Sequence, residues 1–315
     1  MFASRVLDGQ VALVTGGGTG IGLAIGQSLG RLGARIVVAS RSAEHIEAGV
    51  RTLEADGIEV HSVTVDVRDP AQVDAMVAEA LDRFSRVDIL INNAAGNFIC
   101  RAEDLTPNGW NAVIGIVLNG SFYCSRAVGR HMIARGGGGS IVSILANYAW
   151  TGSAGTIHSA SAKAGVLAMT QTLAVEWARH QIRVNAVAPG PVESPGAARQ
   201  LWSSREAVDA ITKTVPLGRW AGADEIAASL NDGRCIRLVW DTLVKALGEG
   251  LVFHWVRLAV DISHGRCEVN CVIDGIESAA GSEEIAQRIG EAPSGMDGRF
   301  RYFFVACLRD ALWPA

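Results

Sequence analysis

The segment at residues 15–22 reads TGGGTGIG, and its glycines stand where a strand is expected to turn into a helix. It follows the apolar run Val11–Val14 and precedes a stretch in which apolar residues have helical spacing. A side chain at Gly16, Gly20 or Gly22 would keep a phosphate away from the backbone or force an unfavourable φ. The positive N-terminal end of the helix then points at the phosphates. The sequence therefore predicts a dinucleotide-binding protein.

Strand and helix patterns alternate along the first two thirds of the chain. Short apolar runs that alternate with amphipathic helices are typical of a parallel sheet covered by helices on both faces. We therefore expect an α/β fold with a doubly wound parallel sheet, Rossmann-like, in a single domain. The expected strands are Val11–Val14, Ile36–Ala39, Val60–Val65, Ile89–Asn92, Ser140–Leu145 and Arg183–Val187. The expected helices are Leu23–Leu32, Ala43–Ala55, Ala71–Phe84, Pro107–Arg135 and Ser159–Arg179.

The length and composition fit a soluble enzyme. The chain has 315 residues, of which 49% are hydrophobic, enough for a substantial core. A net charge of −4 gives no general attraction to nucleic acid or to an anionic membrane, so neither is expected as a partner. The first ten residues lack the apolar core of a signal peptide, and no uninterrupted apolar stretch reaches the length of a membrane span. We expect a cytoplasmic protein whose six cysteines stay reduced.

Further motifs follow the glycine-rich segment in a fixed order. They are Asp66 in DVRDP, Asn92–Gly96, Asn119, Lys163 and Pro189–Pro191. The set spans residues 9–226 and resembles the short-chain dehydrogenases/reductases. The resemblance implies that Asp66 binds adenine or a backbone donor, that Asn92–Gly96 passes the adenine ribose, and that Pro189–Val192 lies beside the nicotinamide. The residues implied to bind the cofactor are Gly16, Gly18, Thr19, Gly20, Ile21, Gly22, Ser40, Arg41, Asp66, Val67, Asn93, Ala94, Lys163, Pro189, Gly190 and Val192.

The end of the second expected strand bears on the choice between NAD and NADP. In the family that the chain resembles, an acidic residue there binds the ribose 2′-hydroxyl and repels a 2′-phosphate. Here the position holds Ser40, followed by Arg41. A hydroxyl and a guanidinium suit a phosphate, which arginine can bind through two hydrogen bonds. We therefore expect NADP(H) as the cofactor.

The catalytic tyrosine is displaced from its usual place in that family. Most members have Tyr-x-x-x-Lys with a serine thirteen residues before the tyrosine, but counting back from Lys163 these positions hold Ser159 and Ala146. The nearest tyrosine is Tyr148, fifteen residues before Lys163. This offset resembles the 2,4-dienoyl-CoA reductases. Other segments that are similar to those enzymes are residues 92–98, 105–122 and 173–192.

This closer resemblance implies reduction of an unsaturated acyl-CoA thioester in fatty acid β-oxidation. Hydride goes to a distant carbon of the diene, negative charge gathers on the thioester oxygen as a dienolate, and hydrogen-bond donors must face that oxygen. By resemblance, Tyr148 and Asn97 are these donors, and solvent protonates the carbon. Lys163 holds the hydroxyls of the nicotinamide ribose, and Ser159 helps to orient the site. The residues implied to contact the acyl-CoA are Arg68, Phe98 and Thr106.

Other functions and other roles remain open at this point. A short-chain reductase acting on a carbonyl would make Tyr148 incidental, and an NADP-binding protein without turnover would fit the missing serine and tyrosine. Thr106 also fits a simple helix N-cap before Pro107. Asn119 is expected to hold a helix irregularity. His158 stands where a base could act, but the family uses none there, and we assign it no role.

The last quarter of the chain departs from the family pattern. We expect a reductase domain at residues 1–229, with a substrate loop at 191–215, and an atypical segment at 230–315. Val272–Gly275 loosely resembles the final strand of the family but comes late in the chain. A lineage-specific replacement and an altered reading frame both explain the segment. Its cysteines lack the spacing of a zinc site, and no metal is expected.

The family resemblance also implies a homo-oligomer, either a dimer or a tetramer. Two long helices, here Pro107–Arg135 and Ser159–Arg179, pair across a two-fold axis into a four-helix bundle, and the final helix and strand build a second interface. Small residues that would allow a close approach are Ala160, Ala162, Ala164 and Gly165. We expect the dimer to persist and the tetramer contact to be weakened or made differently.

Overall fold

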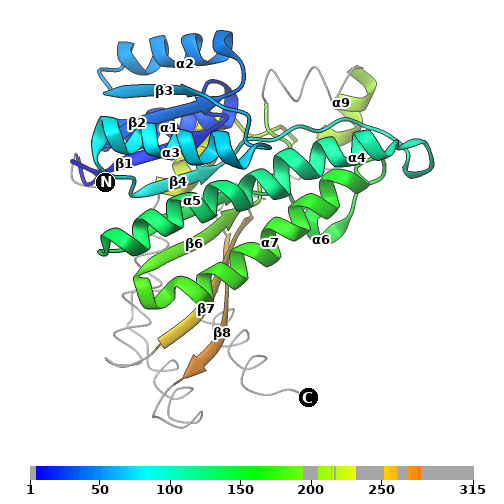
Figure 1. Cartoon of the computed structure of the whole chain (residues 1–315). Coiled ribbons are helices and arrows are strands. Elements are labelled where there is room, and N and C mark those ends of the chain that lie inside the picture. Colours follow the sequence, from blue (N-terminus) through cyan, green and yellow to red (C-terminus); the bar gives the residue numbers. More distant parts are fainter. Residues whose placement is uncertain are drawn as a thin grey trace. The chain divides into compact units, whose positions relative to one another are not determined.

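The structure is a computed structural model that describes residues 5–193, 205–213, 215, 218–231, 252–261 and 268–277. Its central feature is a six-stranded parallel sheet with the strand order β3-β2-β1-β4-β5-β6 (Figure 1). The strands are β1 (Val11–Thr15), β2 (Arg35–Ser40), β3 (Val60–Thr64), β4 (Ile89–Asn92), β5 (Gly139–Ile144) and β6 (Ile182–Val187). The order reverses between β1 and β4, and ligands bind outside the carboxyl ends of strands at such a reversal.

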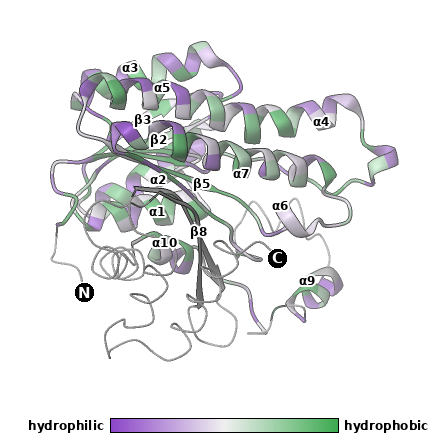
Figure 2. Cartoon of the chain, turned by 90° about the horizontal axis from the view of Figure 1, so that it is seen from below, coloured by the Kyte–Doolittle hydropathy of each residue, from purple (hydrophilic) through white to green (hydrophobic). Residues whose placement is uncertain are grey.

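Helices cover both faces of this sheet. In the described part of the chain they are α1 (Gly20–Arg31), α2 (Ala43–Ala55), α3 (Pro70–Phe84), α4 (Pro107–Ile114), α5 (Gly120–Arg135), α6 (Tyr148–Thr151), α7 (Ile157–Trp177), α9 (Arg205–Thr212) and α10 (Ala223–Asn231). Short 3-10 turns lie at Ala102–Asp104 and Ala178–His180. In Figure 2, α3, α5 and α7 lie on one side of the sheet, and α1, α2 and α10 lie on the other.

The alternation of side chains along the strands explains these two layers. In β1, Leu13 packs with residues of α3 and α5, whereas its neighbour Val14 packs with residues of α1 and α2. In β4, Leu90 and Ile91 divide in the same way. Each strand is therefore buried on both faces, as its continuous apolar run indicates. The expected doubly wound α/β fold is confirmed, and the expected strands agree with the structure to within one or two residues at each end.

The expected helix Pro107–Arg135 is one continuous helical stretch made of three parts. A π-helical turn at Gly115–Asn119 separates α4 from α5, which is the irregularity expected at Asn119. By length and composition this stretch could cross a membrane, although polar residues such as Asn111 and Asn119 interrupt it, and half of its most apolar window is buried inside the protein. Buried core helices of soluble proteins have the same composition, so its apolar character fits its place in the core.

Helices α5 and α7 approach closely within the subunit. A Cβ at Gly129 of α5 would lie 2.5 Å from the ring of Trp177 of α7. Gly165 of α7 packs against Leu118, because a Cβ there would lie 3.0 Å from both methyl groups of that leucine. Ala162 is fully buried in the same subunit. Ala162 is therefore not available for a contact between subunits, which corrects the sequence interpretation of that residue, whereas Gly165 is only partly buried.

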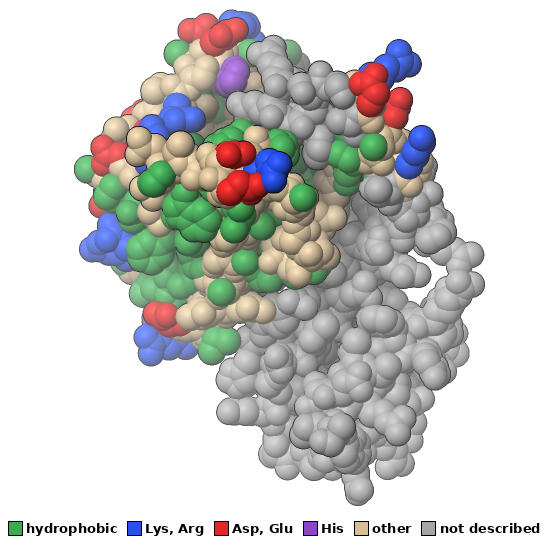
Figure 3. Space-filling view, turned by 90° about the vertical axis from the view of Figure 1, so that its right-hand side faces the viewer, with side chains coloured by type: hydrophobic (Ala, Val, Ile, Leu, Met, Phe, Trp, Pro, Cys, Tyr) green, Lys and Arg blue, Asp and Glu red, His purple; other side chains and the backbone are tan. Residues whose placement is uncertain are grey.

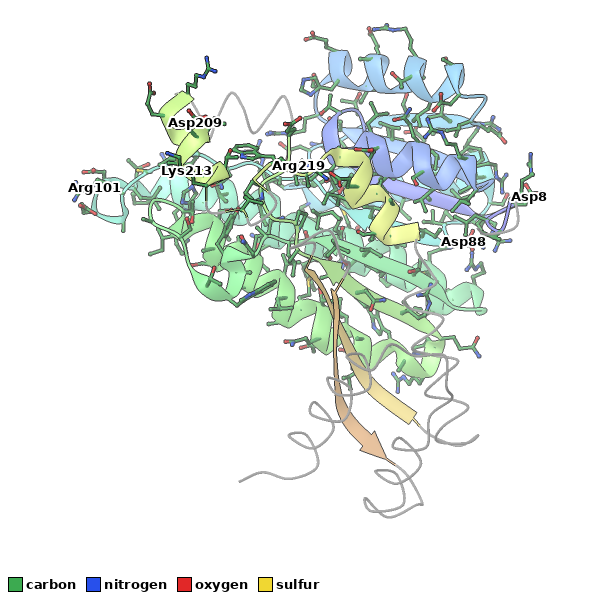
Figure 4. All side chains as sticks on the ribbon, turned by 180° about the vertical axis from the view of Figure 1, so that it is seen from behind. Asp8, Asp88, Arg101, Asp209, Lys213 and Arg219 are labelled. Atoms are coloured by element: carbon green, nitrogen blue, oxygen red, sulfur yellow. The ribbon has the colours of Figure 1, made fainter. Side chains whose placement is uncertain are left out.

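A buried carboxylate holds the amino-terminal edge of the sheet. Asp88, directly before β4, accepts hydrogen bonds from the backbone N–H of Val11 (3.0 Å), from Arg86 (2.7 Å) and from Arg135 (2.6 Å). Burial alone would raise the pKa of Asp88, but these hydrogen bonds bring it below its usual value. Figure 4 places Asp88 and Arg101 at opposite ends of the molecule. The Asp88 cluster thus lies away from the carboxyl edge of the sheet.

The chain divides into two compact units, residues 1–231 and residues 232–315. In the second unit, β7 (Val252–Asp261) and β8 (Glu268–Glu277) pair with each other in antiparallel orientation. The segment Val272–Gly275 lies in β8, so its resemblance to a parallel final strand is corrected by this pairing. Of the expected substrate loop at residues 191–215, residues 194–204 and 214 lie outside the described residues.

Candidate active site

The glycine-rich turn at residues 15–22 joins β1 to α1 and comes close to Asn93 after β4. Gly16 has a φ of +64° and Gly20 a φ of +54°, a region that side chains disfavour. A Cβ at Gly16 would lie 2.9 Å from Asn93 Nδ2, and a Cβ at Gly22 would overlap the carbonyl oxygen of Gly16. The close approach of backbone segments therefore requires these glycines.

The turn is braced by Asn93, which follows the neighbouring strand β4, and by Thr15, the last residue of β1. Asn93 Nδ2 donates to the carbonyl oxygens of Thr15 (3.0 Å) and Gly16 (3.2 Å). The Thr15 hydroxyl accepts from the backbone N–H groups of Asn93 and Ala94, each at 3.0 Å, and donates to the Ile91 carbonyl at 3.1 Å. Asn93 and Ala94 thus fix the turn that the sequence assigns to the pyrophosphate.

The N-terminus of α1 is suited to an anion. Thr19 is the N-cap residue, but its hydroxyl makes no capping hydrogen bond, and the first turn has no acidic side chain. The first N–H groups of a helix have no intrahelical partner, so they attract phosphate. Gly18 packs against α2, because a Cβ there would overlap the carbonyl of His45. The residues present therefore fit the pyrophosphate of a dinucleotide.

Two arginines flank one carboxylate beyond the ends of β2 and β3. Arg68 Nε lies 3.0 and 2.9 Å from the two carboxylate oxygens of Asp66, and its backbone N–H donates to the same group at 3.0 Å. Arg41, which follows Ser40, has Nη1 3.9 Å from Asp66 Oδ2, and 52% of its side chain is exposed. The hydrogen bond from Arg68 is the main cause that lowers the pKa of Asp66. Arg41 is the cation with more freedom to meet a phosphate.

Three polar side chains converge at the carboxyl ends of β4 and β5. Asn97 follows β4, Tyr148 begins α6 shortly after β5, and Ser159 lies in the first turn of α7. Tyr148 Oη is 3.0 Å from Ser159 Oγ, and Asn97 Nδ2 donates to Tyr148 Oη over 3.4 Å. Because β4 and β5 are parallel neighbours, the segments that leave their carboxyl ends meet at one edge of the sheet.

Lys163 lies one turn after Ser159, on the same face of α7. Its side chain is buried, and Nζ donates a hydrogen bond to the carbonyl oxygen of Ile144 at the end of β5. Burial lowers the pKa of Lys163 to about 8. The amine is thus mostly charged at neutral pH, in surroundings where solvent screens its charge poorly.

An apolar cavity of about 340 Å³ lies beside Asn97. Its lining residues are Gly96, Asn97, Phe98, Ala112, Val113 and Ile116. The Phe98 ring is wedged between two helices, because a Cβ at Gly109 of α4 would lie 3.1 Å from it and the ring of His158 of α7 has its centroid 4.4 Å away. A mostly apolar wall with a single amide suits a hydrocarbon chain that carries one polar end.

The remaining predicted residues lie around this edge. Thr106 is the N-cap of α4, and its hydroxyl accepts from the backbone N–H of Gly109 at 3.1 Å, so the fold already uses it. Val67 is buried and packs where a side chain at Gly120 would intrude. Ile21 of α1 packs against the core between α1 and the sheet.

In the described part of the chain no group of three His, Cys, Asp or Glu side chains could hold a metal ion. Pro189, Gly190 and Val192 follow β6, and Val192 forms a bridge with Ala221.

Sequence reasoning assigned no role to two residues that the structure places at the site. Thr15, at the end of β1, supports the Asn93 backbone, and a buried threonine at a strand end before a glycine turn is a weak signal for this role. His158 is fully buried against Phe98. The sequence could have indicated the burial of His158, because this residue lies four residues before Ala162 and eight before Val166, on the buried face of α7.

The fold and the site define the class of protein. The chain belongs to the short chain dehydrogenase family, whose model matches residues 10–205, and it is accordingly an oxidoreductase. A protein of Bacillus subtilis (strain 168), named as a probable 2,4-dienoyl-CoA reductase that produces (2E)-enoyl-CoA, is 46% identical over 223 residues. The match covers 70% of this chain and 88% of that protein. A peroxisomal 2,4-dienoyl-CoA reductase of Danio rerio, which produces (3E)-enoyl-CoA, is 40% identical over 72% of this chain and 76% of its own length.

Solved structures agree with this assignment. A crystal structure of a short chain dehydrogenase from Bacillus anthracis has a TM-score of 0.63 and 45% sequence identity, covering 71% of this chain and 88% of its own. A crystal structure of a protein from Beutenbergia cavernae, named as a putative NAD(P) dependent gluconate 5-dehydrogenase, holds NADP at low occupancy. It has a TM-score of 0.68 and 32% identity. That match covers 73% of this chain and 91% of the other.

Proposed function

We propose that this chain is an NADPH-dependent reductase of 2,4-dienoyl-CoA thioesters. The observation that carries the proposal is the cluster of Tyr148, Ser159 and Asn97 beside an apolar cavity, with the tyrosine at an offset unusual for the wider family. The dienoyl-CoA reductases among its relatives support the same substrate class. Oxidation of NADPH in the presence of a dienoyl-CoA, with no oxidation in the presence of simple ketones, tests the proposal.

Tyr148 and Asn97 supply the hydrogen-bond donors that this reaction needs. When bound, NADPH would supply a hydride for the far carbon of the conjugated diene, so negative charge would develop on the thioester oxygen. Tyr148 Oη and Asn97 Nδ2 lie 3.4 Å apart, so one oxygen atom between them can accept from both. The Ser159 hydroxyl, 3.0 Å from Tyr148 Oη, orients the tyrosine. Solvent returns a proton to the carbon chain.

Lys163 serves both the cofactor and the tyrosine. Its Nζ is anchored by the Ile144 carbonyl at the end of β5, which directs the remaining N–H groups toward the carboxyl edge of the sheet. A charged amine there binds the hydroxyls of the nicotinamide ribose and favours the electron-rich state of a nearby oxygen. Burial excludes water from the amine and strengthens both effects.

We propose that Arg68 and Phe98 contact the acyl-CoA. The Thr106 hydroxyl caps α4, so Thr106 contacts the acyl-CoA only through its other atoms. Arg68 keeps part of its guanidinium exposed while Asp66 holds the other edge, which suits a phosphate of CoA. Phe98 lines the cavity for the acyl chain. We place this enzyme in the cytoplasm, with neither nucleic acid nor a membrane as a partner.

Replacing Arg41 by Ala is expected to weaken NADPH binding selectively. Loss of one charge-assisted contact to the 2′-phosphate costs about 1–2 kcal/mol, or roughly 5- to 30-fold in Kd, while the Kd of NADH changes little. Fluorescence titration of both cofactors measures the effect. Arg51→Ala, on the exposed face of α2, is the matched control and leaves both Kd values unchanged. Equal losses of NADPH and NADH affinity in Arg41→Ala would contradict the role of Arg41.

The exposed face of α5 and α7 is proposed to pair with a second copy of the chain. Phe122 of α5 is 45% exposed and Val175 of α7 is 50% exposed, which is costly for apolar side chains in water. Figure 3 also shows hydrophobic side chains gathered on the side of the molecule that carries α4 and α7. The second interface proposed for a tetramer falls on the C-terminal segment, most of which lies outside the described residues.

Phe122→Glu is expected to convert the dimer into a monomer. A charged carboxylate cannot be buried at a helix pair without a partner, so association becomes unfavourable by several kcal/mol, on the order of 3. Light scattering measures the mass of the purified chain. Val6→Glu, a change at a similarly exposed apolar residue, is the control and keeps the wild-type mass. A wild-type chain that is monomeric would show that this face is not an interface.

A further inference from the structure

We propose that His158 is a positioning residue that holds Phe98, and through Phe98 the amide of Asn97, at the acyl-CoA cavity. This inference rests on the proposed function, because the ligand of the cavity is taken to be an acyl-CoA. It gives a role to a residue that contacts neither the tyrosine nor the lysine of the site by hydrogen bonding in the described structure.

The burial of His158 is complete. Its side chain has 0% exposure, and it lies one turn before Ala162 and two turns before Val166 on the inner face of α7. Ala162 and Val166 belong to a small core cluster with Val113 of α4, and Phe98 packs against that cluster. His158 therefore extends this core toward the loop that carries Asn97, and it does not face solvent.

The imidazole of His158 packs on the Phe98 ring. The ring centroids are 4.4 Å apart with an angle of 39° between the planes, a tilted arrangement that aromatic pairs favour. On another side, Phe98 is close to α4, because a Cβ at Gly109 would lie 3.1 Å from Phe98 Cζ. Loss of the imidazole would leave a void on one side of Phe98, and the ring could then leave its place in the cavity wall.

The position of Phe98 determines the orientation of the Asn97 amide. The backbone N–H of Phe98 donates to Asn97 Oδ1 at 2.9 Å, which fixes which way the Asn97 amide faces. The same amide donates through Nδ2 to Tyr148 Oη. A chain of contacts thus runs from His158 through Phe98 and Asn97 to the tyrosine. Movement of Phe98 would turn the amide away from the thioester oxygen that it is proposed to bind.

The chemistry of the surroundings requires His158 to act as a neutral ring. Neither ring nitrogen has a hydrogen-bond partner in the described part of the chain. Burial lowers the pKa of His158, and the approach of the ring to the backbone of Phe98, which does not meet hydrogen-bond geometry, opposes that shift only in part. Packing, and not proton transfer, is therefore the function that its contacts support.

In the part of the chain that the structure describes, the helices packed around His158 carry no acidic side chain that could stabilise a charged ring. Among the described residues, α4 and the π turn at Gly115–Asn119 carry no titratable group, α6 carries Tyr148, and the nearby part of α7 carries Lys163. Arg101, Glu103 and Asp104 beyond the Asn97 loop are exposed. Protonation would place a cation in this apolar wall with a second cation on its own helix, so it would force the imidazole out and release Phe98.

Three variants test the inference. His158→Ala removes the ring, His158→Phe restores an aromatic surface without a titratable group, and His61→Ala on β3 serves as the matched histidine control. Calorimetry measures binding of a saturated acyl-CoA to each protein in the presence of NADP⁺, at neutral pH and over a series of lower pH values that extends well below the ordinary histidine pKa of about 6.5, because burial lowers the pKa of His158. Hydrogen–deuterium exchange follows the amides of residues 97–101 in the proteins without ligand, and the kcat of each protein is measured in parallel.

We expect His158→Ala to weaken acyl-CoA binding and to lower kcat, each about tenfold, because small displacements of positioning groups cost up to about 100-fold. NADP⁺ affinity stays unchanged, exchange at residues 97–101 becomes faster, and His158→Phe restores all wild-type values. In acid the wild type loses acyl-CoA affinity and His158→Phe keeps it. Unchanged binding and exchange in His158→Ala would overturn the inference. A wild type that binds no acyl-CoA would overturn the proposed function, and the exchange experiment would still decide on His158.

Discussion

Tyr148→Phe is expected to lower kcat with a dienoyl-CoA substrate by about 100-fold or more, because one oxyanion donor is typically worth roughly 3–4 kcal/mol. The substitution keeps the ring and removes only the hydroxyl that lies 3.0 Å from Ser159 Oγ and 3.4 Å from Asn97 Nδ2. The Kd of NADPH should not change, because the tyrosine is assigned to the substrate oxygen. Steady-state kinetics and cofactor titration measure the two quantities separately.

Two further variants sharpen this prediction. Tyr123→Phe removes the hydroxyl of a tyrosine in α5 that packs against the core, and it should leave kcat unchanged. Asn97→Ala should lower kcat in the same direction as Tyr148→Phe, since the two donors share one oxygen. Full activity in Tyr148→Phe would contradict the dienoyl-CoA mechanism and would point to Ser159 as the group nearest the reacting atoms.

Lys163→Met should abolish most activity without unfolding the protein. Methionine has a similar length and is apolar, so it fills the same buried space, whereas the lysine charge there is costly. We expect kcat/KM to fall by about 100-fold or more, in line with the loss of a charge that holds the cofactor and stabilises the developing oxyanion. The free energy of unfolding, measured with urea, should stay equal or rise. Retention of activity would show that the buried amine takes no part in the reaction.

The pH dependence of the wild type follows from the same residue. Burial lowers the pKa of Lys163 to about 8, so the amine is protonated below that pH and neutral above it. Because the charged form is the proposed active form, kcat/KM for NADPH should be level near neutral pH and fall as the pH rises through about 8. The profile of Lys163→Met should lack this inflection. A wild-type rate that rises through the same range would contradict the assignment.

Much of the fold could be predicted from the sequence because its signals are local. Short apolar runs such as Val11–Val14 predict strands buried on both faces, and Asp69 before Pro70 caps a helix in the way that its residue type indicates. The π turn at Gly115–Asn119 was expected from Asn119 and not from the apolar spacing, which differs little from that of an α-helix. The antiparallel pairing of β7 with β8 joins consecutive strands, with Asp261 opposite Glu268, but this segment departs from the family pattern, so the resemblance did not supply the pairing.

The candidate site, like the fold, could be predicted only in part from the sequence. The family resemblance implies that Tyr148, Ser159 and Lys163 share one site. In the structure Tyr148 Oη lies 3.0 Å from Ser159 Oγ, and Lys163 follows one turn later in α7. The sequence could not predict which of the candidate side chains already bond to other groups of the protein. Arg68, assigned to CoA from the resemblance, is also the main partner of Asp66, and the Thr106 hydroxyl already caps α4. Such shared use depends on three-dimensional distances that residue types and spacing do not fix.

The most direct test of the proposed activity is a comparison of substrates with the purified full-length chain. NADPH oxidation is measured with a 2,4-dienoyl-CoA, with the corresponding saturated acyl-CoA and with a panel of ketones, and the products are identified by mass spectrometry and NMR. We predict rapid oxidation with the dienoyl-CoA alone and one enoyl-CoA formed per NADPH consumed, with a much lower rate when NADH replaces NADPH. Turnover of ketones without turnover of the dienoyl-CoA, or no turnover of any substrate while NADPH binds, would contradict the proposed function.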